Sequence, residues 1–276
     1  MIKRIITGAA IVAITVVFFL LRYFVNFRVF ELFVWAICGI ATYEVARAVM
    51  ERTSFKSFLT NVVFGAVGVP IYFMFESSFG SGYGALAFLV LTALIVVTNV
   101  IFWYTEGKKT SLIAEILPVL YPSLLVIPIL LLNGSNRGYR GFVLLIALFV
   151  IPACSDTAAY FIGNKIGGKK LCPKISPKKT VSGAIGGTIG GVIGSILVCV
   201  IFRPYPDAIF PILLFTLIGF VGSILTVFGD LFESYIKRRV GIKDMGNILP
   251  GHGGVSDRID GLLFLAPFIF LVSLIL

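Results

Sequence analysis

The chain has 276 residues, of which 58% are hydrophobic and 13% charged, and its mean hydropathy is +1.04. This composition excludes an ordinary soluble globule and predicts an integral membrane protein. The formal net charge of +10 is suited to anionic partners. Because the basic segments carry neither a nucleic-acid-binding motif nor interleaved aromatic residues, we expect lipid headgroups or a small polyanion rather than nucleic acid.

Apolar runs recur along the whole chain and predict about nine membrane-spanning helices. A spanning helix needs roughly 20 apolar residues, whereas a barrel strand needs ~9–11 with alternation. The runs are approximately Ile5–Leu21, Val29–Met50, Phe58–Phe75, Gly84–Tyr104, Leu112–Leu132, Gly141–Ile162, Gly183–Phe202, Ile209–Phe232 and Ile259–Leu276. Pro118, Pro122 and Pro128 are expected to bend the fifth helix. The fold class is therefore an all-α polytopic membrane protein.

Lysine and arginine are distributed unevenly between the two sides of the predicted membrane protein. With nine spans, alternate loops face the same side, and most of the 23 Lys and Arg fall on the side of Lys3 and Arg4. The positive-inside rule then places the N-terminus and the two long polar loops in the cytoplasm. No small-residue cleavage site follows the first run, so a retained first helix is expected. We predict a multi-pass protein of the inner (cytoplasmic) cell membrane.

The chain divides by polarity into residues 1–140, a helical scaffold, and residues 141–276, which carry nearly all the unusual polar groups. Glu31, Glu44 and Glu115 are the exceptions in the scaffold. Glu44 and Arg47 are three residues apart and are spaced to pair on one helix face. For all three glutamates we expect a packing or interface role.

The run that begins at Gly183 carries two stripes of glycines at four-residue spacing. This small-xxx-small pattern lets helices approach closely in lipid, within one chain or in a homodimer. A phosphate-binding loop would need the spacing GxxxxGK[ST], which is absent. The stripes are Gly183, Gly187 and Gly191, and Gly186, Gly190 and Gly194.

Two polar segments of the second half precede and enter this glycine-rich helix. Asp156 and Tyr160 are four residues apart near the inner end of the sixth span. A functional carboxylate and a hydrogen-bonded Asp that joins two helices are both open interpretations. Lys178, Lys179 and Thr180 lead into the start of the seventh span, where free amides and the helix dipole favour phosphate. An ordinary positive-inside loop is the alternative for these lysines.

Four carboxylates border the most polar segment of the chain. Asp230 and Glu233 lie three residues apart at the inner end of the eighth span, and Asp257 and Asp260 repeat that spacing where the ninth begins. Carboxylate oxygens are the hard ligands that Mg²⁺ prefers. The segment therefore predicts a metal-dependent site, with a structural ion-pair network as the alternative.

Glycines and bases lie between these acidic pairs. The turn at 251–254 lets the backbone amides of Gly253 and Gly254 approach a phosphate. His252 is either a donor to a phosphate oxygen or a structural hydrogen bonder. Positive charge for an anionic partner comes from Lys237, Arg238 and Lys243.

Residues 234–260 resemble the signature of the phosphatidate cytidylyltransferases, also called CDP-diacylglycerol synthases. The resemblance rests on Ser234-Tyr-Ile-Lys-Arg, Lys243-Asp244, Leu-Pro-Gly-His252-Gly-Gly and Asp257-Arg-Ile-Asp260. Two further segments, 155–160 and 176–180, resemble other motifs of the family. One position departs from the pattern, because Ser182 stands where the family usually has Glu.

The resemblance implies transfer of CMP from CTP to phosphatidic acid, giving CDP-diacylglycerol and pyrophosphate, with Mg²⁺ required. Asp230 and Asp257 are then expected to bind one Mg²⁺ ion or a pair, supported by Asp156, Glu233 and Asp260. The residues expected to bind the substrates are Ser176, Lys178, Lys179, Thr180, Lys237, Arg238, His252, Gly253 and Gly254. Those expected to act on the reacting groups are Asp230, Asp257, Lys237, Arg238, Lys243, Asp244, His252 and Arg258.

Two other functions are compatible with the composition. A CTP-dependent polyprenol or phytol kinase would transfer the γ-phosphoryl group and leave CDP. A cation-coupled transporter would need inverted repeats and charges near the bilayer midplane. The sequence shows no internal repeat, and its acids cluster at helix ends beside basic loops.

Overall fold

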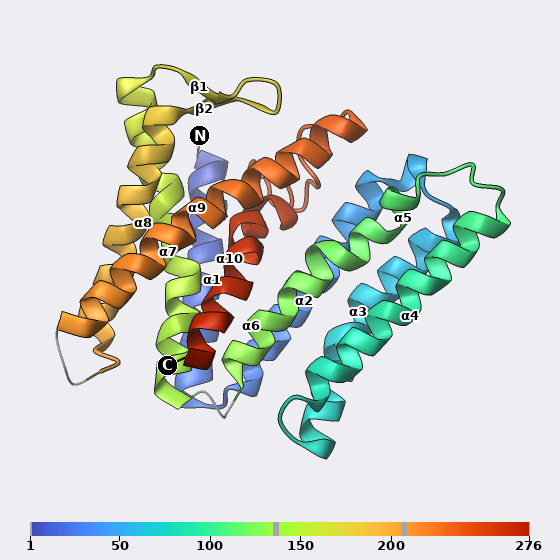
Figure 1. Cartoon of the computed structure of the whole chain (residues 1–276), viewed down its shortest axis with the longest axis horizontal. Coiled ribbons are helices and arrows are strands. Elements are labelled where there is room, and N and C mark those ends of the chain that lie inside the picture. The colour runs from blue at the N-terminus through green and yellow to red at the C-terminus, as the bar shows by residue number, and fades with distance from the viewer. Residues whose placement is uncertain (1, 135–137, 206–208, 276) are drawn as a thin grey trace. The chain divides into compact units, whose positions relative to one another are not determined.

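The structure is a computed structural model that describes residues 2–134, 138–205 and 209–275, with side chains from residue 6 onward (Figure 1). The side chains of Lys3 and Arg4, which entered the prediction of orientation, lie outside this part. The helices are α1 (Ile2–Phe24), α2 (Arg28–Ala48), η1 (Met50–Arg52), α3 (Phe55–Phe79), α4 (Tyr83–Thr105), α5 (Leu112–Pro118), η2 (Val119–Leu124), α6 (Leu125–Asn133), α7 (Gly138–Ile166), α8 (Val181–Phe202), α9 (Ile209–Val240) and α10 (Ser256–Ile275). The strands are β1 (Lys170–Cys172) and β2 (Ser176–Thr180).

Within these described ranges, nine helical segments are long and apolar enough to cross a membrane. The predicted all-α polytopic fold is thereby confirmed, and a two-stranded hairpin is added to it. The predicted bend of the fifth span is confirmed as well. The chain leaves helical geometry at Tyr121, whose φ of −137° and ψ of 118° lie in the extended region. Pro122 follows directly, and a proline disfavours the helical conformation of the residue before it.

Helix α9 is longer than the apolar run that predicted it. It extends for 32 residues and ends at Val240, so the polar residues after Phe232 continue the helix. Glu233 and Lys237 are ion-paired one turn apart within this extension, which supports helix beyond the apolar run. Gly241 follows with a φ of +79°, a backbone conformation in which glycine commonly ends a helix.

The segment predicted as a loop before the seventh span contains an antiparallel hairpin. Lys170 pairs with Thr180, and Cys172 pairs with Ser176. Thr180 then caps α8, since its hydroxyl accepts a hydrogen bond from the amide of Gly183 at 3.1 Å. The lysines of β2 are therefore held at a defined distance from the first turn of α8.

The chain forms two compact units, the first of which comprises residues 1–136 and 240–259. In this unit α3 lies between α2 and α4, and α2 also contacts α1, α5, η2 and α6 (Figure 1). Its core contains the fully buried rings of Phe30, Phe64 and Phe88. Glu115, also fully buried, accepts hydrogen bonds from Ser54, Ser57 and Thr110. Its expected packing role is thereby confirmed.

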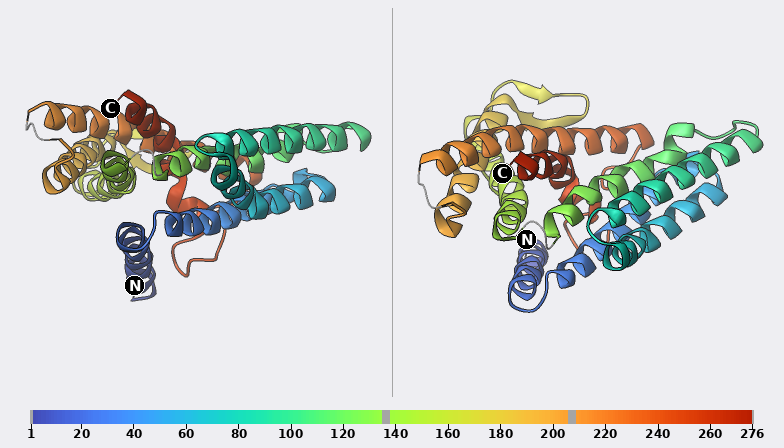
Figure 2. Two further views of the ribbon diagram at one scale, coloured as in Figure 1. Left: turned by 90° about the horizontal axis from the view of Figure 1, so that it is seen from below. Right: turned by 60° about the horizontal axis from the view of Figure 1, so that its bottom comes forward.

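The second unit comprises residues 137–239 and 260–276. Helices α7 and α8 lie side by side along their lengths in this unit, and the hairpin adjoins the start of α8 (Figure 2). A Cβ atom on Gly187 would press on the carbonyl of Ser155, and one on Gly190 would overlap the carbonyl of Cys154. The glycine stripes therefore pack within the chain, as predicted, and a homodimer through them remains a prediction.

Candidate functional site

An ion pair joins the hairpin to α9 in the second unit. Lys179, the penultimate residue of β2, places its Nζ 2.5 Å from Oδ2 of Asp230. The other carboxylate oxygen, Oδ1, accepts a hydrogen bond from the hydroxyl of Ser234 at 3.2 Å. Both partners of the ion pair are partly exposed, with 25% and 33% of their side-chain surface accessible. A polar ligand therefore has access to this pair.

A second ion pair follows one turn along α9 and is buried. Lys237 Nζ lies 3.1 Å from Oε1 of Glu233, and their side chains are only 9% and 0% exposed. Burial of two charges requires that they neutralise each other, because each alone would lose its hydration without compensation. The sequence analysis gave a structural ion-pair network as the alternative to a metal site, and this pair is of the kind that such a network would contain.

Asp260 on α10 is surrounded by other carboxylates of the same unit. It lies close enough to Glu233, Asp230 and Asp156 for their charges to repel its own. Gly229 permits this approach, since a Cβ on it would overlap the backbone of Asp260 and Gly261. The structure therefore brings together the four acidic residues of this unit that the sequence singled out.

Basic and hydroxyl groups of the hairpin complete the group of polar residues in this unit. Arg238 donates through Nε to the carbonyl of Ile175 at 3.4 Å and so connects α9 to the hairpin turn. Lys178 is exposed and Ser176 is half-buried. Ser182, which stands where the resembled family usually has Glu, donates to the carbonyl of Gly167. This hydrogen bond joins the first turn of α8 to the segment that precedes β1.

The donor chemistry of this group fits a magnesium ion. Mg²⁺ prefers oxygen ligands and is commonly held by one or two carboxylates together with waters and substrate phosphates. Asp230 already binds a cation, the ammonium group of Lys179. Across the described part of the chain, however, no three His, Cys, Asp or Glu side chains are grouped so that they alone could hold a metal. Metal binding therefore stays a prediction that needs ligands from the substrates.

The segment between α9 and α10 belongs to the first unit and is organised by Asp257. Its Oδ2 accepts hydrogen bonds from the amides of Met245 at 2.9 Å and Gly254 at 2.8 Å. These two amides lie nine residues apart, so one carboxylate closes the whole loop on itself. Asp257 is only 8% exposed. It therefore has a structural function in addition to the chemical one predicted.

The glycine turn lies within this loop. Leu249 donates its amide to the carbonyl of Gly253 at 3.0 Å, and the amide of His252 donates to Leu249 at 2.9 Å. Gly251 and Gly253 have φ values of +78° and +84°, which side-chain-bearing residues rarely adopt. The Nδ1 atom of His252 is buried and lacks a hydrogen-bond partner in the described structure. Lys243, Asp244 and Arg258 are exposed.

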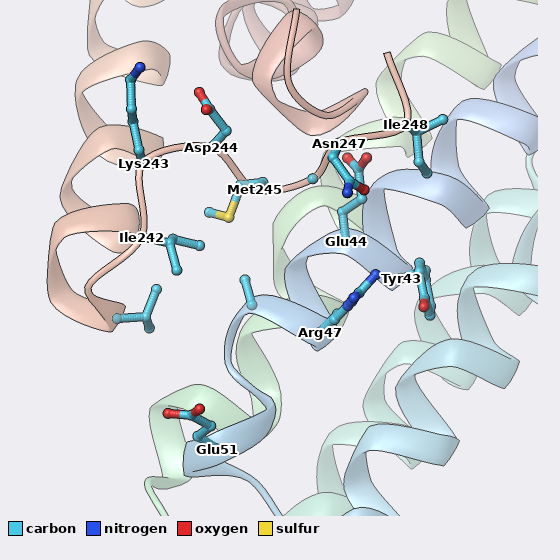
Figure 3. Close-up of a pocket in the computed structure, with 13 residues that line it drawn as sticks. Tyr43, Glu44, Arg47, Glu51, Ile242, Lys243, Asp244, Met245, Asn247 and Ile248 are labelled. Atoms are coloured by element: carbon cyan, nitrogen blue, oxygen red, sulfur yellow. The ribbon is translucent and has the colours of Figure 1, made fainter. Parts of the chain in front are cut away.

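Glu44 is the residue of this unit that the sequence interpretation missed. It is 2% exposed, and its Oε2 accepts a hydrogen bond from the amide of Ser256 at 2.9 Å. Figure 3 shows Glu44 directed from α2 toward the loop. Glu44 is one of the residues that line a pocket of about 600 Å³. Among described residues its expected pairing with Arg47 is not formed. No sequence signal identified this contact, because the partner is a backbone amide and not a side chain of a particular type.

Comparison with known proteins covers the whole chain. A model of the cytidylyltransferase family matches residues 2–276. The phosphatidate cytidylyltransferase of Helicobacter pylori strain J99 is 34% identical over 262 residues, which are 95% of this chain and 88% of that protein. The protein of the same name from Bacillus subtilis strain 168 is 29% identical over 280 residues, covering 97% and 96%. That from Thermotoga maritima is 32% identical over 187 residues, covering 67% and 69%.

Proposed function

The chain belongs to the cytidylyltransferase family, and on that premise we propose that it transfers the CMP moiety of CTP to phosphatidic acid. The products are CDP-diacylglycerol, a precursor for phospholipid synthesis, and pyrophosphate. Relatives named phosphatidate cytidylyltransferase at 29–34% identity support this assignment. So does the position of Asp260, the last residue of the signature, close to Asp230, Glu233 and Asp156.

The reaction exchanges one phosphorus–oxygen bond for another. A phosphate oxygen of phosphatidic acid bonds to the α-phosphorus of CTP, and the bond from that phosphorus to the β-phosphate oxygen breaks, which releases pyrophosphate. A phosphate monoester has a second pKa near ~6, so the attacking oxygen is largely ionised at neutral pH. The protein therefore needs no strong general base. Its task is to bring two anions together and to hold the departing charge.

The bases of the site are suited to that task. We assign binding of the triphosphate to Lys178 and Lys179 on β2, helped by Ser176 and by the first turn of α8 after Thr180. Release of Lys179 from Asp230 would make its ammonium group available to a phosphate.

The remaining bases surround the lipid phosphate and the pyrophosphate. These are Lys237 and Arg238 on α9 and Lys243 and Arg258 at the ends of the loop, with Asp244 beside Lys243. The amides of Gly253 and Gly254 and the ring of His252 are further donors.

Mg²⁺ would be held by Asp230 and Asp257, with Asp156, Glu233 and Asp260 in supporting positions, as one ion or a pair. When bound, it neutralises negative charge on the phosphates and on pyrophosphate. Asp257 is kept in a single orientation by two amides, which favours a ligand of defined geometry. Asp230 is accessible and already bound to a cation.

The same proposal defines the place of the reaction. Phosphatidic acid would remain in the bilayer with its headgroup at the helix ends, while CTP would enter from the cytoplasm. This location follows from the excess of Lys and Arg on the loops that carry the site. It requires that the protein lie in the inner membrane with those loops on the cytoplasmic face.

The observation that carries the proposal is the concentration of charges around Asp260, where four carboxylates and two lysines meet. The experiment uses purified protein in nanodiscs with CTP, phosphatidic acid and Mg²⁺, each omitted in turn. Pyrophosphate release is expected only when all three are present. Release without phosphatidic acid, or formation of CDP instead of pyrophosphate, would contradict the proposal. CTP-independent ion flux in liposomes would favour a transporter.

A further inference from the structure

Glu44 supplies a hydrogen-bond acceptor to a helix of which it is not a part. The first four amides of an α-helix have no partner within that helix, and a negative charge near them is favourable. α10 begins at Ser256, and the amide of Ser256 donates to Oε2 of Glu44 at 2.9 Å. Glu44, which is 212 residues earlier in the chain, thus caps α10.

The loop is shaped to admit this carboxylate. A Cβ atom on Gly246 or on Gly254 would overlap the Glu44 carboxylate. Met245, next to Gly246, and Gly254 itself donate their amides to Asp257. The two carboxylates therefore hold the same short stretches of backbone, Asp257 from within the loop and Glu44 from α2.

We propose that Glu44 is a positioning residue for the reaction: by capping the first turn of α10 it sets the orientation of Asp257, without touching the substrates. This inference rests on the proposed function, which makes Asp257 a residue of the active site. The Glu44 carboxylate is buried, and its Oε1 lacks a hydrogen-bond partner among the described residues. Its 2% exposure and its contact with Gly246 favour a role through the backbone over direct contact with a nucleotide.

Two variants, one nearly isosteric and one shortened, separate a positioning role from a direct role of the charge in the reaction. Glu44→Gln keeps a carbonyl oxygen at the same reach and removes the charge. Glu44→Asp keeps the charge and withdraws the oxygens by one methylene. Loss of a partner that orients an active-site ligand typically costs about 10–100-fold in activity. We expect that loss in kcat for Glu44→Asp, with the KM values for CTP and phosphatidic acid changed less than about threefold, and a loss below about fivefold for Glu44→Gln.

Hydrogen exchange of the intact protein in nanodiscs provides a readout that does not depend on turnover. The amides of residues 254–257 are expected to exchange at least about tenfold faster in Glu44→Asp than in wild type, and at nearly the wild-type rate in Glu44→Gln. Glu31→Gln is the matched control. It changes a buried glutamate of the same helix, 6% exposed, and should leave both readouts unchanged.

A second variant reaches the same contact from the loop. Gly246→Ala retains Glu44 but pushes against its carboxylate, so it should reproduce the kcat loss and the faster exchange of Glu44→Asp. Wild-type kcat and exchange in Glu44→Asp would overturn the inference. The inference would also be overturned if Glu44→Gln were inactive and Glu44→Asp active. That result would mean that the negative charge of Glu44 itself takes part in the reaction. A wild-type protein without CTP- and phosphatidate-dependent turnover refutes the proposed function instead, while the exchange data still decide whether Glu44 caps α10.

Discussion

Lys179 and Asp230 form an ion pair of 2.5 Å that connects the end of strand β2 to helix α9. The pair joins a residue expected to bind phosphate to one expected to bind metal. Substrate and Mg²⁺ would therefore compete with this contact as they bind. The ammonium group of Lys179 would then bind a substrate phosphate, and the carboxylate of Asp230 would bind Mg²⁺.

Lys179→Ala should raise the KM for CTP more than it lowers kcat. The lysine is proposed to contact CTP in the ground state and in the transition state alike, and loss of such uniform binding raises KM. Initial rates of pyrophosphate release at varied CTP measure the effect. Lys174→Ala, which removes an exposed lysine from the same hairpin, controls for the change in net charge. Equal KM values for Lys179→Ala and Lys174→Ala would mean that Lys179 does not bind CTP and serves only as a positive charge of a cytoplasmic loop.

Asp257→Asn separates the two functions of that carboxylate. The side-chain oxygen of Asn can still accept from the amides of Met245 and Gly254, so the loop should keep its structure, whereas the charge for Mg²⁺ is lost. We expect a kcat at least about a hundredfold lower, since removing one preorganised group that stabilises charge in the transition state costs about 10²–10³-fold. Hydrogen exchange of residues 244–254 should be unchanged. High activity in Asp257→Asn would limit Asp257 to organising the loop.

Glu233→Leu should destabilise the protein strongly, because it removes the carboxylate that is paired with the buried ammonium group of Lys237. Removal of one partner from a buried pair typically costs about 3–5 kcal/mol. Thermal unfolding in detergent measures the change, and the double variant with Lys237→Met should recover much of it. A single variant as stable as wild type would show that water reaches the pair.

Gly190→Val tests the packing of α7 against α8. The added side chain would overlap the carbonyl of Cys154 and Cβ of Ala158, and overpacking of this kind costs about 1–3 kcal/mol or more. Both the unfolding temperature and activity should fall, because β2 is joined directly to α8. Ile193→Ala, which alters an exposed side chain of the same helix, should leave the unfolding temperature nearly unchanged. A fully stable Gly190→Val would mean that the two helices do not touch at Gly190.

The spanning helices could be predicted from the sequence because the bilayer imposes a length and a hydropathy on each of them. The end of α9 could not, since hydropathy falls after Phe232 while the ion pair between Glu233 and Lys237 supports a further stretch of helix. The hairpin escaped prediction for a similar reason. β1 has three residues and β2 has five, too few to show a regular alternation beside Pro173 and Pro177.

The residues of the candidate site could be predicted from the sequence where acidic side chains recur at a spacing that places them on one helix face. Asp230, Glu233 and Asp260 were found in this way, and the structure places them near one another. Glu44 was not, because its local neighbour Arg47 suggested a pair within α2. Its actual partner is the backbone amide of Ser256. Contacts between a side chain and a distant backbone leave no pattern in a single sequence.

The fate of two labels in CTP distinguishes transfer of CMP from transfer of the γ-phosphoryl group. With Mg²⁺ and phosphatidic acid, label at the α-phosphorus should enter the lipid extract while label at the γ-phosphorus leaves as pyrophosphate. Asp230→Asn and Asp257→Asn should abolish the transfer in folded protein. Appearance of the γ-label in lipid would contradict CMP transfer, and unchanged transfer of the α-label by both variants would contradict the assignment of Asp230 and Asp257 to the active site.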